Sequence, residues 1–165
     1  MKERIEKCVL MFIMVVWWAL LPQVGYENGD VTDLPSHFLY MFSHANVWHL
    51  AGNLLWLWFF VRGRLYLLPS LAIGFLCSFI PAWSPWGMGV TMGFSGVLFA
   101  IAGIKWGIYC RNASAMGSIF ERSALDEFAA KALPFALIGI IIPHINWCIH
   151  LYCLIAGFAY GRCWR

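Results

Sequence analysis

A serine and a histidine open two separate apolar stretches of this sequence. Ser95 lies in Gly93-Phe94-Ser95-Gly96, directly before one stretch, and His150 begins another. A serine hydroxyl attacks a carbonyl carbon when a base removes its proton, and an imidazole suits that task near neutral pH. We therefore interpret Ser95 as a nucleophile and His150 as its general base.

Groups that could stabilise an oxyanion are also present. His49 and Asn53 are four residues apart, so they project from the same face of a predicted helix. The backbone N–H of Ser95 falls in the first turn of its helix, where amides have no intrahelical partner. We expect these three donors to face the reacting carbonyl, and Gly93 to permit a sharp turn before the nucleophile.

No acid is placed to complete a catalytic triad, because every Asp and Glu falls in a predicted loop or at a chain end. Packing would then have to orient the imidazole. Phe99, about one helical turn after Ser95, is the candidate for a ring stacked on His150. The Gly-x-Ser-x-Gly elbow of soluble hydrolases is excluded, since Val97 stands where its second glycine would be.

The composition indicates an integral membrane protein. Hydrophobic residues make up 62% of the 165 residues and charged residues 12%, which is far more apolar than a soluble domain of this size needs. The apolar runs predict six transmembrane helices in a single domain spanning residues 1–165. Their approximate ranges are 8–21, 48–61, 65–83, 95–110, 128–142 and 147–160.

The positive charges predict an orientation. All eleven Lys and Arg residues fall at the two termini, after the second predicted helix, or around the connection between the fourth and fifth. These positions share one side of a six-helix chain, and positive loops stay in the cytoplasm. We expect both termini to be cytoplasmic. Nothing in the distribution of the +3 net charge is typical of nucleic-acid binding.

The helical rise places the four candidate polar groups at similar depth. Depth is counted at about 1.5 Å per residue from the nearest predicted cytoplasmic charge on the same helix. Ser95 then lies about 15 Å above Lys105 and His150 about 18 Å above Arg162. Asn53 and His49 lie about 14 and 20 Å above Arg62. Small residues spaced by four predict close packing of the two helices that carry Ser95 and His150. They are Gly96, Ala100, Gly103 and Gly107 on one helix, and Gly157 and Gly161 on the other.

Less specific interpretations remain open for each feature. His49 alone could be an interfacial histidine bonded to water, and the glycines alone could serve ordinary helix dimerisation. A haem or metal protein could use several of the five histidines, although only His49 and His150 lie well inside predicted helices. Hydrolysis inside a membrane also needs water, and His44 with His49, Asn53 and Ser95 could line a water-filled cavity open to the outside, under the Gly-, Trp- and Pro-rich loop 81–89. That loop could also be an aromatic belt at the membrane interface.

With these residues in this order, the chain resembles the rhomboid family of intramembrane serine proteases. The matching segments are Phe42-Ser43-His44, His49-Leu50-Ala51-Gly52-Asn53, Gly93-Phe94-Ser95-Gly96, and His150 followed by Gly157 and Gly161. The resemblance implies an all-α, six-helix rhomboid-like bundle. It also implies Ser95 as nucleophile, His150 as base, and His49 with Asn53 as oxyanion donors.

The resemblance further implies cleavage of transmembrane segments of membrane proteins within the lipid bilayer, without a metal or cofactor. Supporting positions would be Gly93, Phe94, Gly96, Phe99, His44 and Gly157. The first loop lacks the Trp-Arg pair often seen in the family, and Tyr26, His37 and Tyr40 are candidates for its positioning role. We expect a multi-pass protein of a bacterial plasma membrane, with its site open to the outer side. The alternative is a non-catalytic rhomboid-like protein that binds transmembrane helices of clients.

Overall fold

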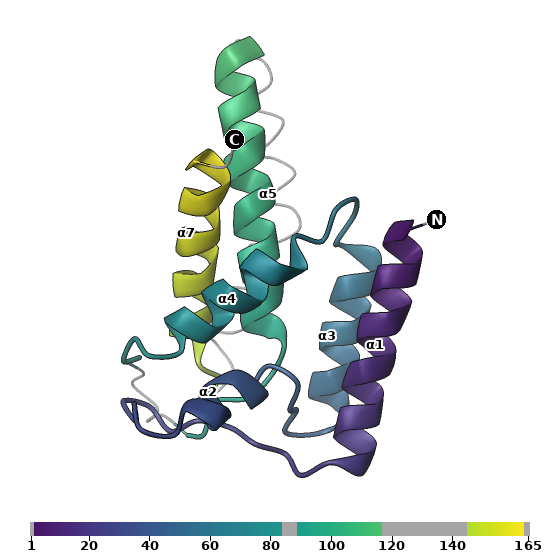
Figure 1. Cartoon of the computed structure of the whole chain (residues 1–165), viewed down its shortest axis with the longest axis vertical. Coiled ribbons are helices and arrows are strands. Elements are labelled where there is room, and N and C mark those ends of the chain that lie inside the picture. Colours follow the sequence, from purple (N-terminus) through teal and green to yellow (C-terminus); the bar gives the residue numbers. More distant parts are fainter. Residues whose placement is uncertain (1, 84–88, 117–144, 164–165) are drawn as a thin grey trace.

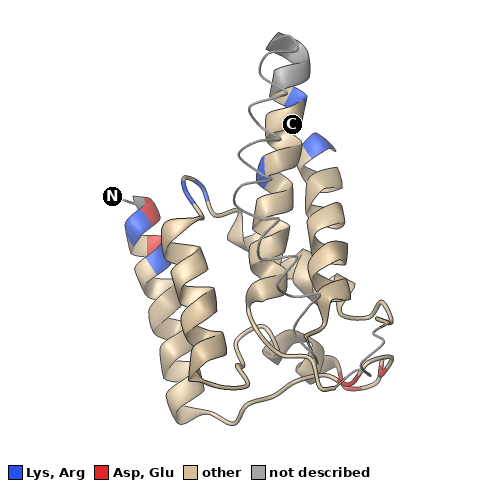
Figure 2. Cartoon of the chain, turned by 180° about the vertical axis from the view of Figure 1, so that it is seen from behind, with Lys and Arg blue, Asp and Glu red and all other residues tan. Residues whose placement is uncertain are grey.

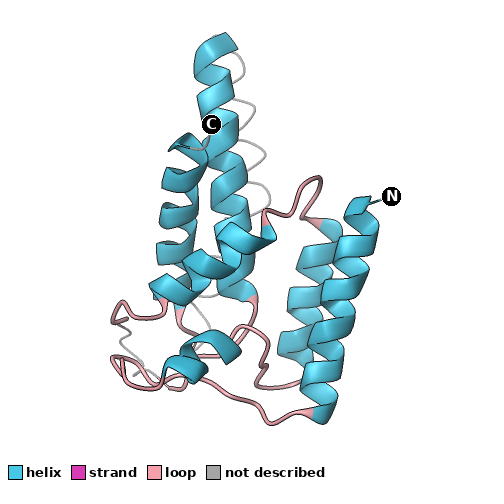
Figure 3. Cartoon of the chain, viewed as in Figure 1, coloured by secondary structure: helices cyan, strands magenta, loops and turns pink. Residues whose placement is uncertain are grey.

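The computed structural model describes residues 2–83, 89–116 and 145–163, and these form helices joined by loops (Figure 3). The helices are α1 (Lys2–Leu20), α2 (Leu34–Leu39), α3 (Val47–Phe59), α4 (Leu67–Cys77), α5 (Ser95–Met116) and α7 (Trp147–Cys163). The predicted all-α fold class is confirmed for this part of the chain. The predicted helix over 128–142 lies outside the described residues, and so does His144, one of the five histidines.

The helices pack in two groups (Figure 1). In one group, α5 and α7 run side by side and α4 packs against both; in the other, α1 packs against α3. The groups meet where α3 contacts α5. The two ends of the chain lie at one end of the molecule with the linker 60–66, and α2 lies at the opposite end (Figure 1).

The helix bounds differ from the predicted ranges in instructive places. The helix predicted over 65–83 is shorter, because Tyr66 adopts a left-handed conformation (φ 48°, ψ 38°) before α4 and the chain turns at Ser78 after it. The short helix α2 was not predicted. Its first turn is capped by Asp33, whose carboxylate accepts a hydrogen bond from the Ser36 N–H, and Pro35 lies in that turn.

Charged residues gather at the two ends of the molecule (Figure 2). Lys and Arg lie at the end that carries both chain termini, and a cluster of acidic residues lies in the loops at the opposite end. Large apolar side chains are exposed between these ends, for example Phe12 (69%), Trp48 (82%) and Leu68 (79%). Such exposed apolar area is typical of a surface that contacts lipid or another protein.

A helix that crosses a membrane must be long as well as apolar. Over residues 2–83, 89–116 and 145–163, none of the helices is both long and apolar enough to cross a membrane.

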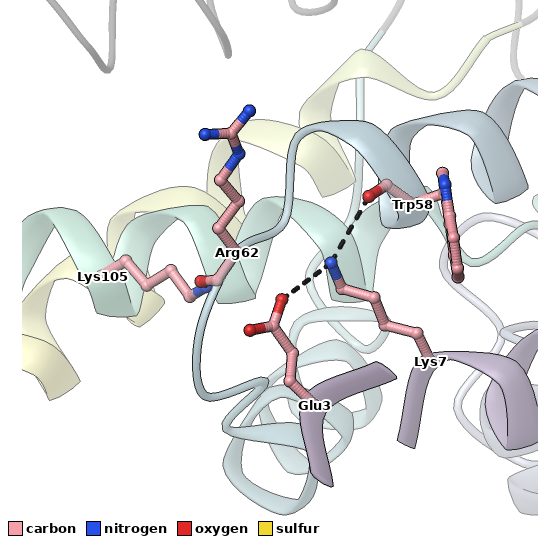
Figure 4. Close-up of polar contacts among 5 residues, drawn as sticks. All are labelled: Glu3, Lys7, Trp58, Arg62 and Lys105. Carbon is pink, nitrogen blue, oxygen red and sulfur yellow. Dashed lines mark hydrogen bonds and ion pairs between the residues drawn. The ribbon is translucent and has the colours of Figure 1, made fainter. Parts of the chain in front are cut away.

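Two lysines hold the C-terminal end of α3 (Figure 4). The Trp58 carbonyl lies in the last turn of α3, where carbonyls lack intrahelical partners. Lys7 of α1 donates a hydrogen bond to this carbonyl at 3.4 Å, and its ammonium is paired with Glu3 at 2.9 Å. Lys105 of α5 donates to the carbonyl of Arg62, just after α3. The end of α3 is thereby bonded to helices of both groups.

Candidate active site

The structure brings Ser95 and His150 together. Ser95 is the first residue of α5, and His150 is the fourth residue of α7. The Ser95 Oγ lies 2.7 Å from the His150 Nε2, which is a short hydrogen bond. In this geometry the hydroxyl can donate to a neutral imidazole, so the ring is placed to accept the serine proton.

The backbones of α5 and α7 lie in direct contact. A Cβ atom added at Gly157 would lie 2.4 Å from the Ala100 carbonyl oxygen, and one at Gly161 would lie 2.2 Å from the Ile104 oxygen. On α5, a Cβ added at Gly103 would lie 2.2 Å from the Leu154 oxygen. Real Cβ atoms essentially never approach other atoms within 3.0 Å. The two helices therefore touch through positions that only glycine can occupy.

Gly96 does not belong to this tight contact. A Cβ added there would lie 3.5 Å from Cys153 Sγ, from Ile149 Cγ1 and from the Tyr40 hydroxyl, all ordinary van der Waals distances. The first turn of α5 is thus separated from α7 by side chains, and the backbones come into direct contact farther along the helices.

Aromatic packing orients the His150 ring. Phe99 stacks on the imidazole with ring centroids 4.6 Å apart and an interplanar angle of 18°, as its helical spacing from Ser95 predicts. Phe99 also packs against Trp56 in a T-shaped arrangement, with ring centroids 4.7 Å apart and an interplanar angle of 89°. Among the described residues, the buried Nδ1 of His150 has no hydrogen-bond partner. The ring is therefore held by packing rather than by a carboxylate.

Position 93, directly before Phe94 and Ser95, requires glycine. Gly93 has φ +127°, a conformation rare for other residues, and its N–H donates to the Tyr40 carbonyl at 2.8 Å. A Cβ at Gly93 would lie 2.6 Å from Cε1 and 2.7 Å from Nε2 of His49. The His49 ring is thus pressed against the backbone that leads into Ser95.

Asn53 completes this side of the site. Its side chain is 4% exposed, and its Nδ2 lies 3.7 Å from the Cβ position of Gly93. No hydrogen-bond partner for this Nδ2 occurs within the described part of the chain. A buried amide donor without a partner is costly unless something else accepts its hydrogen bond. Asn53 and His49 therefore present donor-capable groups beside Gly93, two residues before Ser95.

His44 lies behind His49. Its ring is buried and meets the His49 ring edge-on, with centroids 5.2 Å apart. The ring Nδ1 lies 3.2 Å from the Phe42 carbonyl oxygen. The backbone N–H of His44 donates to the side-chain oxygen of Gln23 at 2.8 Å. Burial, with a smaller effect from His49, lowers the pKa of His44 to about 4. His44 is therefore uncharged at neutral pH and supports His49 by packing.

Phe94, the residue directly before Ser95, is fully buried.

Tyr26, His37 and Tyr40 do not form an exposed positioning surface, because all three are at most 2% exposed. The His37 ring is stacked between Tyr26 at 4.7 Å and Phe79 at 4.1 Å. Its nitrogens lie 2.7 Å from the Ser78 hydroxyl and 2.6 Å from the Asp30 carbonyl. These aromatic residues form the core that joins the loops next to the site.

The sequence interpretation missed three residues that position the site. Asn46 caps α3 by accepting the His49 N–H at 2.9 Å, and Asn146 accepts the Ile149 N–H at 3.2 Å at the start of α7. The third is Trp56, behind Phe99. The asparagines carry a recognisable signal, because asparagine is a favoured N-cap directly before an apolar helix. Trp56 could have been found by extending the His49–Asn53 face by one more turn.

The described histidines make different contacts. Within the described residues, no group of three or more His, Cys, Asp or Glu side chains could hold a metal ion. His37 lies among the loop aromatics and His44 lies against His49, whereas His150 faces Ser95. These histidines are thus distributed over distinct roles.

A family model described as Rhomboid domain matches residues 31–165, which is most of the chain. No curated protein and no solved structure matched the chain. Proteins of this family are integral membrane proteins and are generally intramembrane serine proteases. The match begins before α2 and continues through the segments that carry His49, Ser95 and His150. The chain belongs to the rhomboid family.

Proposed function

We propose that this protein is an intramembrane serine endopeptidase that cleaves transmembrane segments of other membrane proteins with a Ser95–His150 dyad. The observation that carries the proposal is the 2.7 Å contact between the Ser95 Oγ and the His150 Nε2. Family membership supports the reaction class.

The reaction follows from the groups around Ser95. His150 Nε2 takes the hydroxyl proton as the Ser95 Oγ attacks the scissile carbonyl carbon. The oxyanion that forms is stabilised by the Ser95 backbone N–H, by the Asn53 amide and by a His49 ring N–H. His150 then gives its proton to the leaving amine, and an acyl-enzyme ester remains on Ser95. Water, deprotonated by His150, attacks this ester; the bond to Ser95 Oγ then breaks, the carboxylic acid product leaves, and His150 returns the proton to the Ser95 oxygen.

The substrate must expose a peptide carbonyl to Ser95. In a continuous helix the carbonyls are bonded to N–H groups four residues on, so we expect cleavage near a helix-breaking residue. Proline and glycine weaken such bonds most. This condition defines the substrate class as single transmembrane helices with a local break close to one end.

The charge distribution supports the orientation of the site. Lys and Arg lie at the end of the molecule with both termini (Figure 2), and α5 begins with Ser95 at the other end (Figure 1). With positive residues kept in the cytoplasm, the proposed enzyme is a multi-pass membrane protein with both termini on the cytoplasmic side. Its active site then opens toward the outer face.

The test compares the wild type with Ser95→Ala and His150→Ala, purified in detergent and returned to liposomes. A fluorophosphonate probe reports an activated serine, and a transmembrane reporter peptide reports cleavage. Both signals are expected in the wild type and neither in the two variants. Ser70→Ala is the matched control, because Ser70 is a buried serine on α4 outside this site. A folded wild type that binds the reporter without labelling or cleavage would favour the client-binding alternative.

A further inference from the structure

Trp56 packs against Phe99, the ring that stacks on the proposed general base His150. Its edge-on packing against Phe99 has a centroid distance of 4.7 Å, and Phe99 in turn stacks on His150 at 4.6 Å. We propose that Trp56 is a positioning residue, which holds the His150 imidazole toward Ser95 by fixing the Phe99 ring. This inference rests on the proposed function, since it assigns Trp56 a part in the same reaction.

The imidazole needs such support. Rotation about the bond that carries an aromatic or imidazole ring has broad minima, so the surroundings decide where the ring points. Among the described residues no acceptor or donor meets Nδ1 of His150. The stacked face of Phe99 is therefore the contact that limits rotation on that side.

Phe99 can limit this rotation only if its own ring is fixed. Its side chain is 2% exposed and that of Trp56 is 6% exposed, so little space is left around either ring. The interplanar angle of 89° between them is the edge-to-face arrangement favoured by aromatic rings. Without the indole, the Phe99 ring would border a void and could tilt away from the imidazole.

The same helix face carries the proposed oxyanion donors. His49, Asn53 and Trp56 follow a spacing of four and three residues along α3, which places them on one face. Two of them lie beside Gly93, and the third lies behind Phe99. The position of α3 thus sets the donors for the oxyanion and the support for the base together.

The experiment measures kcat and KM for a transmembrane reporter in liposomes, with active sites counted by fluorophosphonate titration. Trp56→Leu is expected to lower kcat per titrated site by about 10- to 100-fold, the loss that a misplaced catalytic group causes, with KM unchanged. Trp56→Phe keeps an aromatic ring and should restore most of kcat. The control is Trp58→Leu, because Trp58 is on the same helix with 40% of its surface exposed.

A double-mutant cycle tests the route through Phe99. If Trp56 acts only by fixing Phe99, then Trp56→Leu should cause little further loss in a Phe99→Leu background. An equal loss in both backgrounds would overturn the proposal. So would a kcat per titrated site equal to that of Trp58→Leu, or a loss seen only as fewer titratable sites. A wild type that neither labels nor cleaves would instead refute the proposed function, and this inference with it.

Discussion

Replacing Gly157 by alanine tests whether backbone contact between α5 and α7 sets the dyad distance. The new Cβ would lie 2.4 Å from the Ala100 oxygen and 3.1 Å from the Ile104 nitrogen. Because contacts under 3.0 Å essentially never occur, the helices must move apart locally by at least 3.0 − 2.4 = 0.6 Å. The obstructing atom belongs to a helical backbone, so it cannot rotate away as a side chain could.

This displacement is large compared with a hydrogen bond. If all of it reached the dyad, the Ser95–His150 distance would grow from 2.7 Å to 3.3 Å, longer than the roughly 2.7–2.8 Å at which hydroxyl hydrogen bonds usually form. A misplacement of 1 Å can cost about 100-fold in rate, so we expect this smaller displacement to lower activity by roughly 10-fold. The stability cost of overpacking, about 1–3 kcal/mol, is partly offset by the roughly 1 kcal/mol advantage of alanine over glycine in a helix. We therefore expect a clear loss of activity in a variant that still folds.

The assay measures the rate constant of fluorophosphonate labelling and the thermal unfolding midpoint on the same preparation of Gly157→Ala. Gly52→Ala is the matched control, because Gly52 is also inside a helix and a Cβ there would meet nothing within 4 Å. The control should label like the wild type and unfold at the same temperature or higher. If Gly157→Ala also labels at the wild-type rate, close backbone packing does not set the dyad distance and this reasoning is refuted.

Two further predictions concern the proposed oxyanion side. Gly93→Ala should abolish fluorophosphonate labelling, because the new Cβ would lie 2.6 Å from the His49 ring. Gly29→Ala is the control and should label normally, because Gly29 also has a positive φ (+83°) but open space around its Cβ position. Equal labelling of the two variants would contradict the steric argument. The second prediction concerns His44, whose pKa is lowered from 6.5 to about 4 in the folded protein. Between these pH values the unfolded chain binds a proton at His44 and the folded chain does not. The stability that neutral, buried His44 contributes is therefore complete above pH 6.5 and is lost as the pH falls toward 4. The wild type should therefore lose about 3 kcal/mol more than His44→Gln over that range, measured by denaturant unfolding at each pH, and parallel curves would show that His44 stays charged or exposed.

The parts of the candidate site that could be predicted from sequence are those that follow from helical periodicity. Spacing along a helix determines which side chains share a face and how far along the axis they lie, so the amino-acid order alone groups His49 with Asn53, and Phe99 with Ser95. Contacts between helices depend on tertiary packing, which no local pattern contains. The edge-on contact of Trp56 with Phe99 is of that kind.

The ends of helices and the loops were less predictable. An apolar run continues past Cys77, yet α4 ends there because the chain turns at Ser78 and proline follows at position 81. The glycine pattern on α5 also did not show which positions are tight, because Gly103 meets the α7 backbone whereas Gly96 has room for a methyl group. Such differences arise from the local angle between two helices and not from residue type.

The two lysine contacts at the end of α3 have a mechanical consequence. They fix the helix near Trp58, whereas Asn53 and His49 lie about 8 and 14 Å farther along its axis, at about 1.5 Å per residue. If α3 pivoted about this end as a rigid body, a tilt of about 5° would move His49 by about 1.2 Å and Asn53 by about 0.7 Å on the same helical rise. The Lys7 and Lys105 contacts therefore lie at the end of α3 where a small change of helix angle has its largest effect on His49.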